Sequence, residues 1–402
     1  MAQHKQRFSP LRDRLVVLAQ AVGTVAAVVL LSLLVRTLWH APAEELPDFS
    51  ALTVTAEMTL GQLAEQNNLP PKVVAKALKA ELPAQAGQTI AALGLSAEQA
   101  RQALARTLAL KAERESKDFG KIYVKFALWI VLLILPLVLL IRRRLTRAAQ
   151  VAMLAGAAVL FGVILGSDPS PMGTVKDAIV LGGAHRAVFW PRIIALAVFL
   201  LIVVAANKFI CSWGCQFGTL QELLYRLNRR GPARRGVFPL IRLPYTLSAT
   251  IRVLVFIALI VVAFAWAFDL IGPVDPFKVY RPAALGWLGG GFVALLLVAS
   301  VVVYRPWCSL FCPFGLVAWL FERLSFWRVR VDLGKCIACQ ACALACPSES
   351  MHGILLRRAL PQDCFACGDC LKACPTGAVQ FTRPGAIRRS AQDADVLAKL
   401  RR

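Results

Sequence analysis

The sequence predicts a mainly helical fold. It comprises six transmembrane helices containing a parallel repeat of two helical hairpins, a small helical domain after the first span, and a small cysteine-rich α+β domain near the C-terminus. The 402 residues are 58% hydrophobic with a mean hydropathy of +0.62, which is too apolar for a soluble chain of this length. Several apolar stretches approach the ~20 residues that cross a lipid bilayer. Eight of the twelve cysteines share one repeated spacing between residues 336 and 374.

The first span is expected at residues 15–34, within an N-terminal anchor of residues 1–38. Four basic residues precede it: Lys5, Arg7, Arg12 and Arg14. Because basic residues mark the cytoplasmic side of a span, the N-terminus is expected in the cytoplasm. A signal peptide cleaved near Ala41-Pro42-Ala43 is the alternative, but the apolar run exceeds the ~7–15 residues of a signal core. Both interpretations send the following residues across the membrane.

Residues 39–120 are expected to form a small helical domain in the periplasm. Two segments match the capping-box pattern of a helix start: Thr59 with Gln62, and Ser96 with Gln99. A helix-turn-helix role on DNA is an alternative, but no basic recognition helix stands out. The net charge of +23 comes mainly from basic residues at the ends of the apolar stretches, so we expect no nucleic-acid partner.

Five further spans are expected, at about residues 122–141, 148–165, 193–210, 253–268 and 285–303. Arginine-rich segments follow the second and the fourth spans, and they mark the cytoplasmic side. The second span and the arginines after it make up residues 121–147. Polar loops are then expected in the periplasm, one bearing Asp168 and His185 and the other bearing Asp275. With six spans, both termini lie in the cytoplasm, and the chain crosses the inner membrane of a bacterium.

An internal repeat relates the last four spans, within residues 148–325. Residues 207–218 align with 304–315 at a constant offset of 97 (308 − 211), sharing a basic residue, Cys-Ser, Cys and Phe-Gly. Each copy holds a Cys-x3-Cys pair: Cys211 with Cys215, and Cys308 with Cys312. Both hairpins end on the same side of the membrane, so the repeat is parallel. The i,i+4 spacing predicts that both thiols of a pair lie on one face of a helix.

The two pairs together predict a third metal centre at the cytoplasmic end of the bundle, because a parallel repeat brings equivalent motifs around one axis. Four thiolates suit an iron–sulfur centre or a single iron or zinc ion. Lys208 and Arg305, each three residues before its first cysteine, would offset the negative charge of the thiolates. Reversible disulfides, for which the spacing is awkward, and buried thiols that pack the helix ends are the alternatives.

Residues 326–384 contain the pattern Cys-x2-Cys-x2-Cys-x3-Cys-Pro twice, 28 residues apart (364 − 336), before a tail of residues 385–402. This pattern holds two 4Fe–4S clusters in bacterial ferredoxins, where the fourth cysteine of each run ligates the other cluster. Cluster I is therefore expected on Cys336, Cys339, Cys342 and Cys374. Cluster II is expected on Cys364, Cys367, Cys370 and Cys346. Paired zinc sites are the alternative, but zinc requires neither the third cysteine nor the trailing Cys-Pro.

Paired Cys-x3-Cys motifs at the ends of spans, followed directly by a two-cluster ferredoxin segment, resemble the membrane-bound polyferredoxins of the NapH, MauN and NosR type. The resemblance covers about residues 148–382. The family has Pro after both pairs, as at Pro313, whereas Gln216 follows the first pair here. The resemblance implies a quinol dehydrogenase-type subunit that moves electrons between the quinone pool and a partner redox enzyme. A redox-sensing or maturation factor for a metalloenzyme is the alternative.

Other redox cofactors lack their sequence patterns. No Cys-x-x-Cys is followed by His, which excludes c-type haem, and none of the four histidines lies well inside an expected span. The Ser/Thr-Gly-Ala-Thr sequence, where NosR-like proteins carry a flavin, is not seen. If a quinol binds, as the resemblance implies, polar residues of the outer loops are the candidate proton acceptors. They are His185, Asp168 and Asp275.

Overall fold

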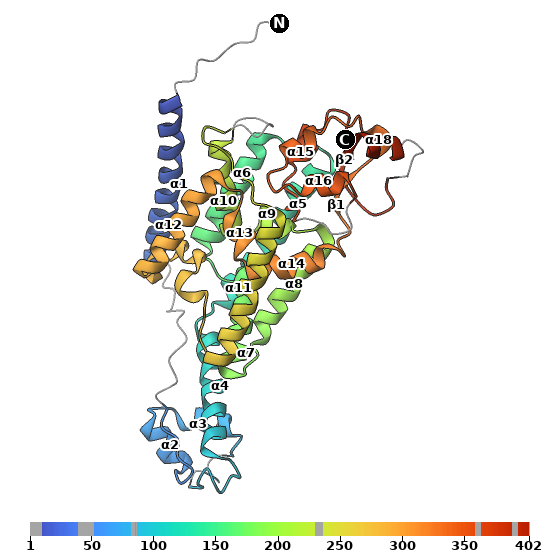
Figure 1. Cartoon of the computed structure of the whole chain (residues 1–402). Coiled ribbons are helices and arrows are strands. Elements are labelled where there is room, and N and C mark those ends of the chain that lie inside the picture. The colour runs from blue at the N-terminus through green and yellow to red at the C-terminus, as the bar shows by residue number, and fades with distance from the viewer. Residues whose placement is uncertain are drawn as a thin grey trace.

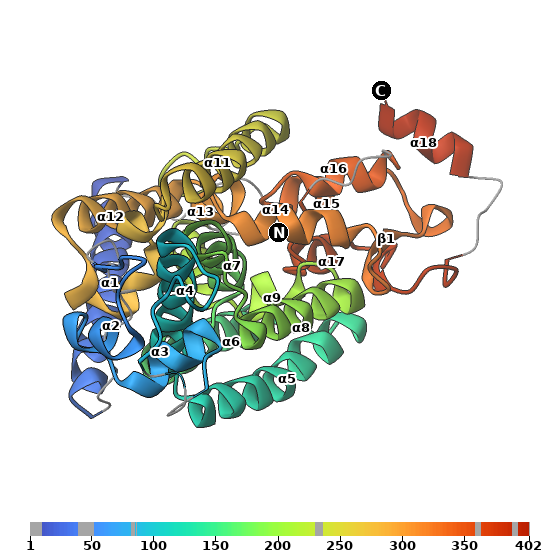
Figure 2. The same cartoon turned by 90° about the horizontal axis from the view of Figure 1, so that it is seen from below.

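The computed structural model describes residues 10–38, 52–81, 85, 87–229, 236–357, 363–387 and 393–401. A helical bundle forms the middle of the molecule, with small helices from the N-terminal part at its lower end and the cysteine-rich segment at its upper end (Figure 1). Seen along the bundle, the cysteine-rich segment lies to one side, opposite α1 (Figure 2). Lys5 and Arg7, which were expected to mark the cytoplasmic side, and the alternative cleavage site at residues 41–43 lie outside the described residues.

Apolar helices occupy all the positions that hydropathy predicts. They are α1 Pro10–Leu38, α5 Phe119–Ile141, α6 Arg147–Ala158 with the π-helical turn η2 Val159–Ile164, α8 Trp190–Ala206, α11 Tyr245–Trp266 and α12 Trp287–Val302. Within the described residues, four of them are long and apolar enough to cross a membrane: α1, α5, α6 with η2, and α11. The helices α8 and α12 are shorter, with 17 and 16 residues.

The α11 helix begins at Tyr245, eight residues before the expected start at 253 (253 − 245). The expectation was wrong because Arg252 does not end the apolar helix: its side chain is buried and pairs with Asp363. Along the rest of α11, Leu254, Ile257 and Phe264 are exposed while Leu259 and Ala263 are buried. An apolar outward face of this kind is suited to lipid.

The α7 helix, Pro171–His185, replaces the polar loop that was expected between the third and fourth spans. Ser170 caps it by accepting a hydrogen bond from the Gly173 N–H at 3.0 Å. Its charged residues do not face solvent, because Lys176 pairs with Asp269 at 2.7 Å and Asp177 pairs with Arg192. The segment therefore packs as a helix against α11, and a polar composition alone was misleading.

Short helices at the cysteine end recur at the offset of the sequence repeat. Their bounds are α9 Phe209–Trp213, α10 Gln216–Asn228, α13 Pro306–Leu310 and α14 Pro313–Glu322, so both starts differ by 97 (306 − 209 and 313 − 216). The prediction that each cysteine pair shares one helix face is wrong. The helix breaks inside each pair, and Cys215 and Cys312 adopt extended backbone as the residues before α10 and α14.

The N-terminal helices are α2 Leu60–Gln66, α3 Pro71–Leu78 and α4 Ala97–Glu115. Both predicted capping boxes are present, at Thr59 and at Ser96. Leu63, Val74 and Leu104 form a small separate core between these helices. After α4, the residue Asp118 caps α5 by accepting a hydrogen bond from the Lys121 N–H at 3.0 Å, which connects this part directly to the bundle.

The C-terminal segment combines two strands with short helices, as the α+β prediction required. Strand β1 Arg328–Val331 pairs antiparallel with β2 Val379–Thr382, and Arg328 lies opposite Thr382. The helices are η6 Leu333–Lys335, α15 Ala341–Ala345, α16 Ser350–Leu355, α17 Asp369–Ala373 and α18 Asp393–Arg401. The remaining short turns, η3 Gly272–Val274, η4 Pro276–Tyr280 and η5 Pro282–Ala284, connect α11 to α12.

Candidate iron–sulfur centres

The four cysteines of the Cys-x3-Cys pairs line one narrow cavity, called here the thiol cavity: Cys211, Cys215, Cys308 and Cys312. All four side chains are buried. The cavity has a volume of about 20 Å³, more than the ~10–15 Å³ that one water molecule needs. The structure thus brings together the two pairs that the repeat predicts to converge, although they come from segments almost one hundred residues apart.

Each pair is shaped by the glycine of the Phe-Gly sequence that follows it. A Cβ atom on Gly218 would lie 2.8 Å from the Cys211 carbonyl oxygen, and one on Gly315 would lie 2.9 Å from the Cys308 carbonyl oxygen. Only glycine allows the first turn of the second helix to approach the first cysteine so closely. The sequence comparison found Phe-Gly in both copies, and this contact explains its presence.

The second cysteine of each pair precedes a helix whose first N–H groups are free of intrahelical partners. Burial raises the pKa of the Cys215 thiol, but the N–H groups of Gly218 and Phe217 and the charge of Arg305 oppose this change. Burial also raises the pKa of Cys312, and the other three cysteines of the cavity raise it further. Burial thus favours the neutral thiols, and their release of protons would require a positive partner such as a metal centre.

The donor set fits an iron–sulfur centre. It consists of thiols alone, and the rest of the cavity wall is apolar apart from glycine, including Phe217, Phe314 and Phe365. Soft thiolate ligands select iron–sulfur clusters, copper(I) or zinc. Among the residues that the structure describes, no group of three His, Cys, Asp or Glu side chains is arranged to hold a single metal ion.

The two predicted cations lie beside the cavity but also pair with carboxylates. Arg305 is fully buried and donates hydrogen bonds to the carbonyl oxygens of Cys211 at 2.5 Å and Ser212 at 3.2 Å. It also pairs with Glu222 at 2.6 Å. Lys208 pairs with Asp363, which belongs to the C-terminal segment. Their role is therefore wider than the expected offset of thiolate charge.

The C-terminal cysteines approach one another across the two runs. Burial raises the pKa of Cys370, and the nearby Cys346 raises it further. Burial likewise raises the pKa of Cys342 to about 12, with Cys374 as the next contribution. Helices α15 and α17, which contain the third cysteine of each run, pack against each other. The structure therefore brings the fourth cysteine of each run close to the other run.

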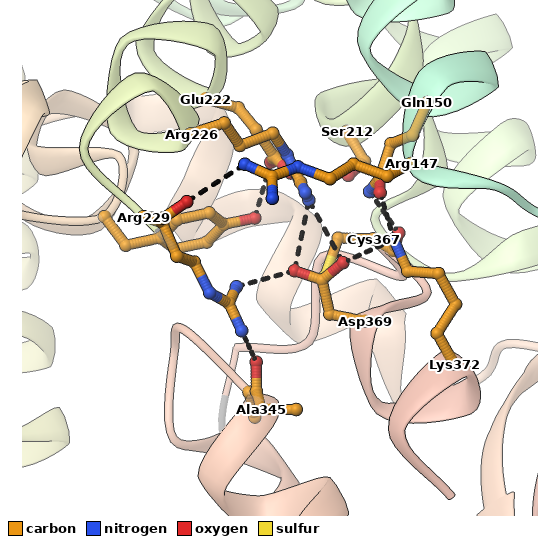
Figure 3. A network of polar contacts seen from close by, with 12 residues as sticks. Arg147, Gln150, Ser212, Glu222, Arg226, Arg229, Ala345, Cys367, Asp369 and Lys372 are labelled. Atoms are coloured by element: carbon orange, nitrogen blue, oxygen red, sulfur yellow. Dashed lines mark hydrogen bonds and ion pairs between the residues drawn. The ribbon is translucent and has the colours of Figure 1, made fainter. Parts of the chain in front are cut away.

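Two carboxylates next to cysteines of the second run attach the C-terminal segment to the bundle. Asp369 lies between Cys367 and Cys370 in sequence and pairs with Arg229 at 2.7 Å and Arg226 at 3.1 Å (Figure 3). Asp363 precedes Cys364 and pairs with Arg252 at 2.7 Å and with Lys208. Buried pairs of this kind hold a unique geometry, because removing one partner leaves an uncompensated charge.

Sequence reasoning missed this attachment. It interpreted the arginine-rich segment after α9 only as a mark of membrane orientation, whereas Arg226 and Arg229 are largely buried and bind the C-terminal segment. Arg229 also donates a hydrogen bond to the Ala345 carbonyl at 2.5 Å (Figure 3). One feature of the sequence could have indicated the attachment: Asp363 and Asp369 stand beside cysteines and can pair with the arginines that follow α9.

Phe365 links the thiol cavity to the second run of the C-terminal segment. Its side chain lines the cavity, and it directly follows Cys364 in sequence. The Arg305 guanidinium lies 5.1 Å from the centre of its ring. The next residue, Ala366, accepts a hydrogen bond from the Trp213 indole at 3.2 Å. The cavity and the Cys364 run are therefore neighbours.

Two of the predicted proton acceptors lie close to the thiol cavity in sequence, since Asp168 is three residues before Pro171 and Asp275 is two residues before Phe277, and both Pro171 and Phe277 line the cavity. Asp168 pairs with Lys117 at 2.7 Å, and Asp275 lies 3.9 Å from the Lys176 ammonium. These two pairs belong to one chain of ion pairs that continues through Glu113, Arg192 and Asp177. Burial lowers the pKa of His185, which ends α7. Asp168 precedes α7, so about 20 Å of helix separates the two, and the structure does not bring them together.

Comparison with known proteins links these features to a family. A family model described as a 4Fe-4S binding domain matches the chain twice, at residues 187–234 and 285–331, and a second model with the same description matches residues 329–351. The first two matches contain the two Cys-x3-Cys pairs and their short helices. No solved structure matches the chain.

Curated relatives point in the same direction. The protein YccM of Escherichia coli is 29% identical over 43% of this chain and 50% of its own length. The regulatory protein NosR of Pseudomonas aeruginosa is 29% identical over 35% of this chain and 20% of its own length. The ferredoxin-type protein NapH of Escherichia coli is 25% identical over 38% of this chain and 52% of its own length. This chain thus spans about half the length of YccM, the first of these relatives.

The matched segments include the cysteines that line the thiol cavity and the first run of the C-terminal segment, so the similarity extends to the residues that carry the chemistry. The apolar helices add the membrane character that these relatives lead one to expect. The family models and these relatives support a membrane polyferredoxin of the NapH and NosR type, to which this chain is similar in its iron–sulfur binding segments.

Proposed function

We propose that the protein moves electrons between the membrane quinone pool and a partner redox enzyme, through three iron–sulfur centres. The observation that carries the proposal is the position of Phe365, which lines the thiol cavity and adjoins Cys364. Four cysteines of the cavity hold the first centre in this proposal. The Cys364 run with Cys346 holds cluster II, and the Cys336 run with Cys374 holds cluster I. The chemistry that these groups supply when bound is electron transfer.

The order of the centres follows from their surroundings. The thiol cavity is narrow and lies within the bundle, and the Cys364 run lies against it through Phe365. The Cys336 run is farther out, since Cys339 is exposed and the Ile337 side chain is 63% exposed. The Cys364 run with Cys346 and the Cys336 run with Cys374 would therefore follow the cavity in that order toward the surface, and the clusters that they would hold supply electron transfer. The partner enzyme meets the protein at the exposed Cys336 run.

In this proposal the chain crosses a bacterial inner membrane six times, and both termini and the C-terminal segment lie in the cytoplasm. Two facts support it. Arginines concentrate at the cysteine end of the bundle, as expected for the cytoplasmic side. Free thiols and metal-bound cysteines persist in the reducing cytoplasm, and none of the twelve cysteines lies in the helical part between α1 and α5. That helical part then lies in the periplasm.

A redox-sensing or maturation role is the second candidate, because one relative is named a regulatory protein. The two functions differ in turnover. A protein of respiration passes electrons repeatedly and rapidly, whereas a sensor changes its oxidation state once for each signal. Within the described residues, the part that this proposal places in the periplasm is the small helical domain, and nothing in that domain favours one of the two functions over the other.

The test measures reduction of the clusters in membrane vesicles that contain the protein. Addition of a quinol is expected to bleach the iron–sulfur absorption within the time of respiratory turnover, and addition of an oxidant for the clusters is expected to restart the reaction. Dithionite, which reduces the clusters directly, is the control for their presence. Reduction by dithionite together with quinol-driven reduction too slow to sustain respiration would favour the sensing role.

A further inference from the structure

A second cavity opens on the side of the bundle, between the first turns of α11 and the helix α14. Its wall includes Tyr245, Thr250, Arg252, Leu254, Leu316 and Trp319. Its volume is about 270 Å³, close to the ~300 Å³ at the lower end of ligand pockets. Leu254 is 61% exposed and Leu320, on the adjacent turn of α14, is 54% exposed. The cavity therefore opens toward the apolar surface of a helix that is long enough to cross the membrane.

Arg252 is the one strongly polar group on the wall of this cavity that is almost completely buried, with 1% of its surface exposed. Its Nη2 pairs with Asp363 at 2.7 Å. Its Nε and Nη1 have no hydrogen-bond partner among the residues that the structure describes. Buried N–H groups are nearly always paired in proteins. Both nitrogens are buried in the structure, so a bound molecule that reaches the guanidinium would supply the acceptor oxygen that they lack.

Arg252 also lies between this cavity and two sets of cysteines. Its Nη1 is 3.5 Å from the place that a Cβ atom on Gly315 would occupy, and the Cβ of Cys312 lies at the same distance from that place. Its partner Asp363 directly precedes Cys364. A molecule bound to Arg252 would thus be a neighbour of both the thiol cavity and the second run of the C-terminal segment.

We propose that this cavity binds the head group of a quinone, with Arg252 donating a hydrogen bond to a quinone oxygen. The flat ring fits beside Tyr245 and Trp319, and the hydrocarbon tail follows the exposed apolar face of α11 into the lipid. A phospholipid head group also offers acceptor oxygens. Unlike a quinone, however, it exchanges no electrons, whereas this cavity lies beside two sets of cysteines that we propose to hold redox clusters. This inference rests on the proposed function, and it moves the quinone away from His185, Asp168 and Asp275.

The reaction at this cavity balances as follows. One quinol loses two electrons and two protons and becomes a quinone. The electrons pass singly to the iron–sulfur centres held by the neighbouring cysteines, and the protons pass to water at the cysteine end of the bundle. Arg252 remains charged throughout, because a guanidinium does not release its proton in proteins. Its part is to bind and orient the ring, so it is a positioning residue.

The first experiment measures bound quinone in the purified holoprotein in lipid nanodiscs, by solvent extraction and mass spectrometry for ubiquinone and menaquinone. Leu316→Trp places a large side chain in the cavity, while Leu320→Trp places the same side chain on the exposed face of the same helix. We expect about one quinone per chain in the wild type and in Leu320→Trp, and at least a tenfold loss in Leu316→Trp. Ala249→Phe, which narrows the cavity from α11, is expected to behave like Leu316→Trp.

The second experiment follows cluster reduction by decyl-ubiquinol and by menadiol, with dithionite and the iron content as measures of an intact protein. Leu316→Trp is expected to lose quinol-driven reduction at least tenfold and to keep reduction by dithionite. If both cavity variants match the wild type in quinone content and in quinol-driven rate, this cavity is not the site, and the proposed function is unaffected.

Two other outcomes separate the remaining cases. If the wild type neither retains quinone nor reacts with quinol while dithionite reduces its clusters, both the quinone exchange of the proposed function and this inference are wrong. If the wild type retains a phospholipid that Leu316→Trp loses, and the quinone content of the two proteins is equal, the cavity is a lipid site and this inference alone is overturned.

Discussion

The molecule contains two networks of buried ion pairs, and they differ in their balance of charge. Among the described residues, the network at the α4 end joins five carboxylates to three cations: Glu113, Asp168, Asp177, Asp269 and Asp275 with Lys117, Lys176 and Arg192. The pairs at the cysteine end join six cations to four carboxylates: Lys208, Arg226, Arg229, Arg252, Arg305 and Lys372 with Glu222, Glu322, Asp363 and Asp369.

Lys125, which is buried, and Arg281 also act on Asp168, so the α4 network has five cations for its five carboxylates. The pairs at the cysteine end have six cations for four carboxylates, a difference of 6 − 4 = +2. A surplus of buried cations is unfavourable unless further negative charge lies nearby. All twelve cysteines of the chain follow α8, and thiolates that hold clusters supply such negative charge. The pairs of the α4 network join α4, α7 and α8, since Arg192 of α8 pairs with Glu113 of α4 and Asp177 of α7.

The largest expected effect is an all-or-none difference between the two ends in their position relative to the membrane. A reporter enzyme that is active only in the periplasm is expected to be active when fused after Gln85 and inactive when fused after Arg402. The reason is the concentration of arginine at the cysteine end. Enzyme activity in whole cells, corrected for the amount of fusion protein, is the measurement. Activity at Arg402 would place the clusters in the periplasm and contradict the proposed electron route.

The next effect concerns the iron content of the cysteine end. Replacing Cys211 and Cys308 by Ser is expected to lower iron and acid-labile sulfide by about a third, since three 4Fe–4S clusters hold twelve iron atoms and the cavity would lose four. The electron paramagnetic resonance signals of the two C-terminal clusters are expected to remain. Ser309→Ala, next to Cys308, is the matched control. An unchanged iron content would show that the cavity cysteines hold no cluster.

A pair of substitutions compares the buried ion pairs of the two ends directly. Glu222→Ala leaves Arg305 without its carboxylate, and Arg192→Ala leaves Glu113 and Asp177 without a shared partner. Each is expected to lower the free energy of unfolding by about 3–5 kcal/mol, because a buried charge loses its partner. Only Glu222→Ala is expected to lower the iron content as well, since Arg305 contacts the Cys211 carbonyl.

Unfolding in a denaturing detergent and iron analysis of the same samples test this comparison. Equal iron loss in the two variants would mean that cluster retention depends on overall stability, and the two ends would then not differ in the way that their charges indicate.

The smallest effect is a pH dependence at the α4 end. Burial raises the pKa of Asp275 to about 6, although Lys176 opposes the rise, whereas an unfolded chain has a value of ~3.9. Between these values the folded protein keeps a proton that the unfolded chain has released, so this residue makes stability fall as the pH rises from about 4 to about 6. Asp275→Asn does not titrate, and its melting temperature is expected to fall less across this window. Parallel melting curves for the two proteins would contradict the raised pKa.

Sequence patterns predicted those parts of the structure that depend on local composition. The apolar run at 122–141 became α5 Phe119–Ile141, and Thr59 and Ser96 formed the capping boxes that their spacing indicates. The alignment of Cys211 with Cys308 also predicted that the two cysteine pairs meet, and in the structure they line one cavity. A repeat can predict such a contact because it carries information about a partner far away in sequence.

Patterns failed where a distant partner decides the local structure. The charge of Lys176 suggested a solvent-exposed loop, because the sequence does not show that Asp269, 93 residues later, pairs with it inside the protein. Arg226 was interpreted only as a marker of the cytoplasmic side, because the sequence does not show that Asp369 accepts its hydrogen bond. The break between Cys211 and Cys215 was hidden for a similar reason, since the close contact of Gly218 with the Cys211 carbonyl forms only after the chain turns.

Phe365 has a consequence for how the protein is made. The wall of the thiol cavity includes this side chain from the C-terminal segment, and Asp363 and Asp369 hold that segment against the bundle. A cluster held there, as proposed, would have to enter a cavity of only about 20 Å³ once the segment has attached. The ribosome releases residues 363–387 last among the parts that form the wall, so the bundle has time to receive its cluster first. In the proposed arrangement, loading of the cavity therefore precedes closure, and a chain that closes empty would have to detach its C-terminal segment to receive a cluster.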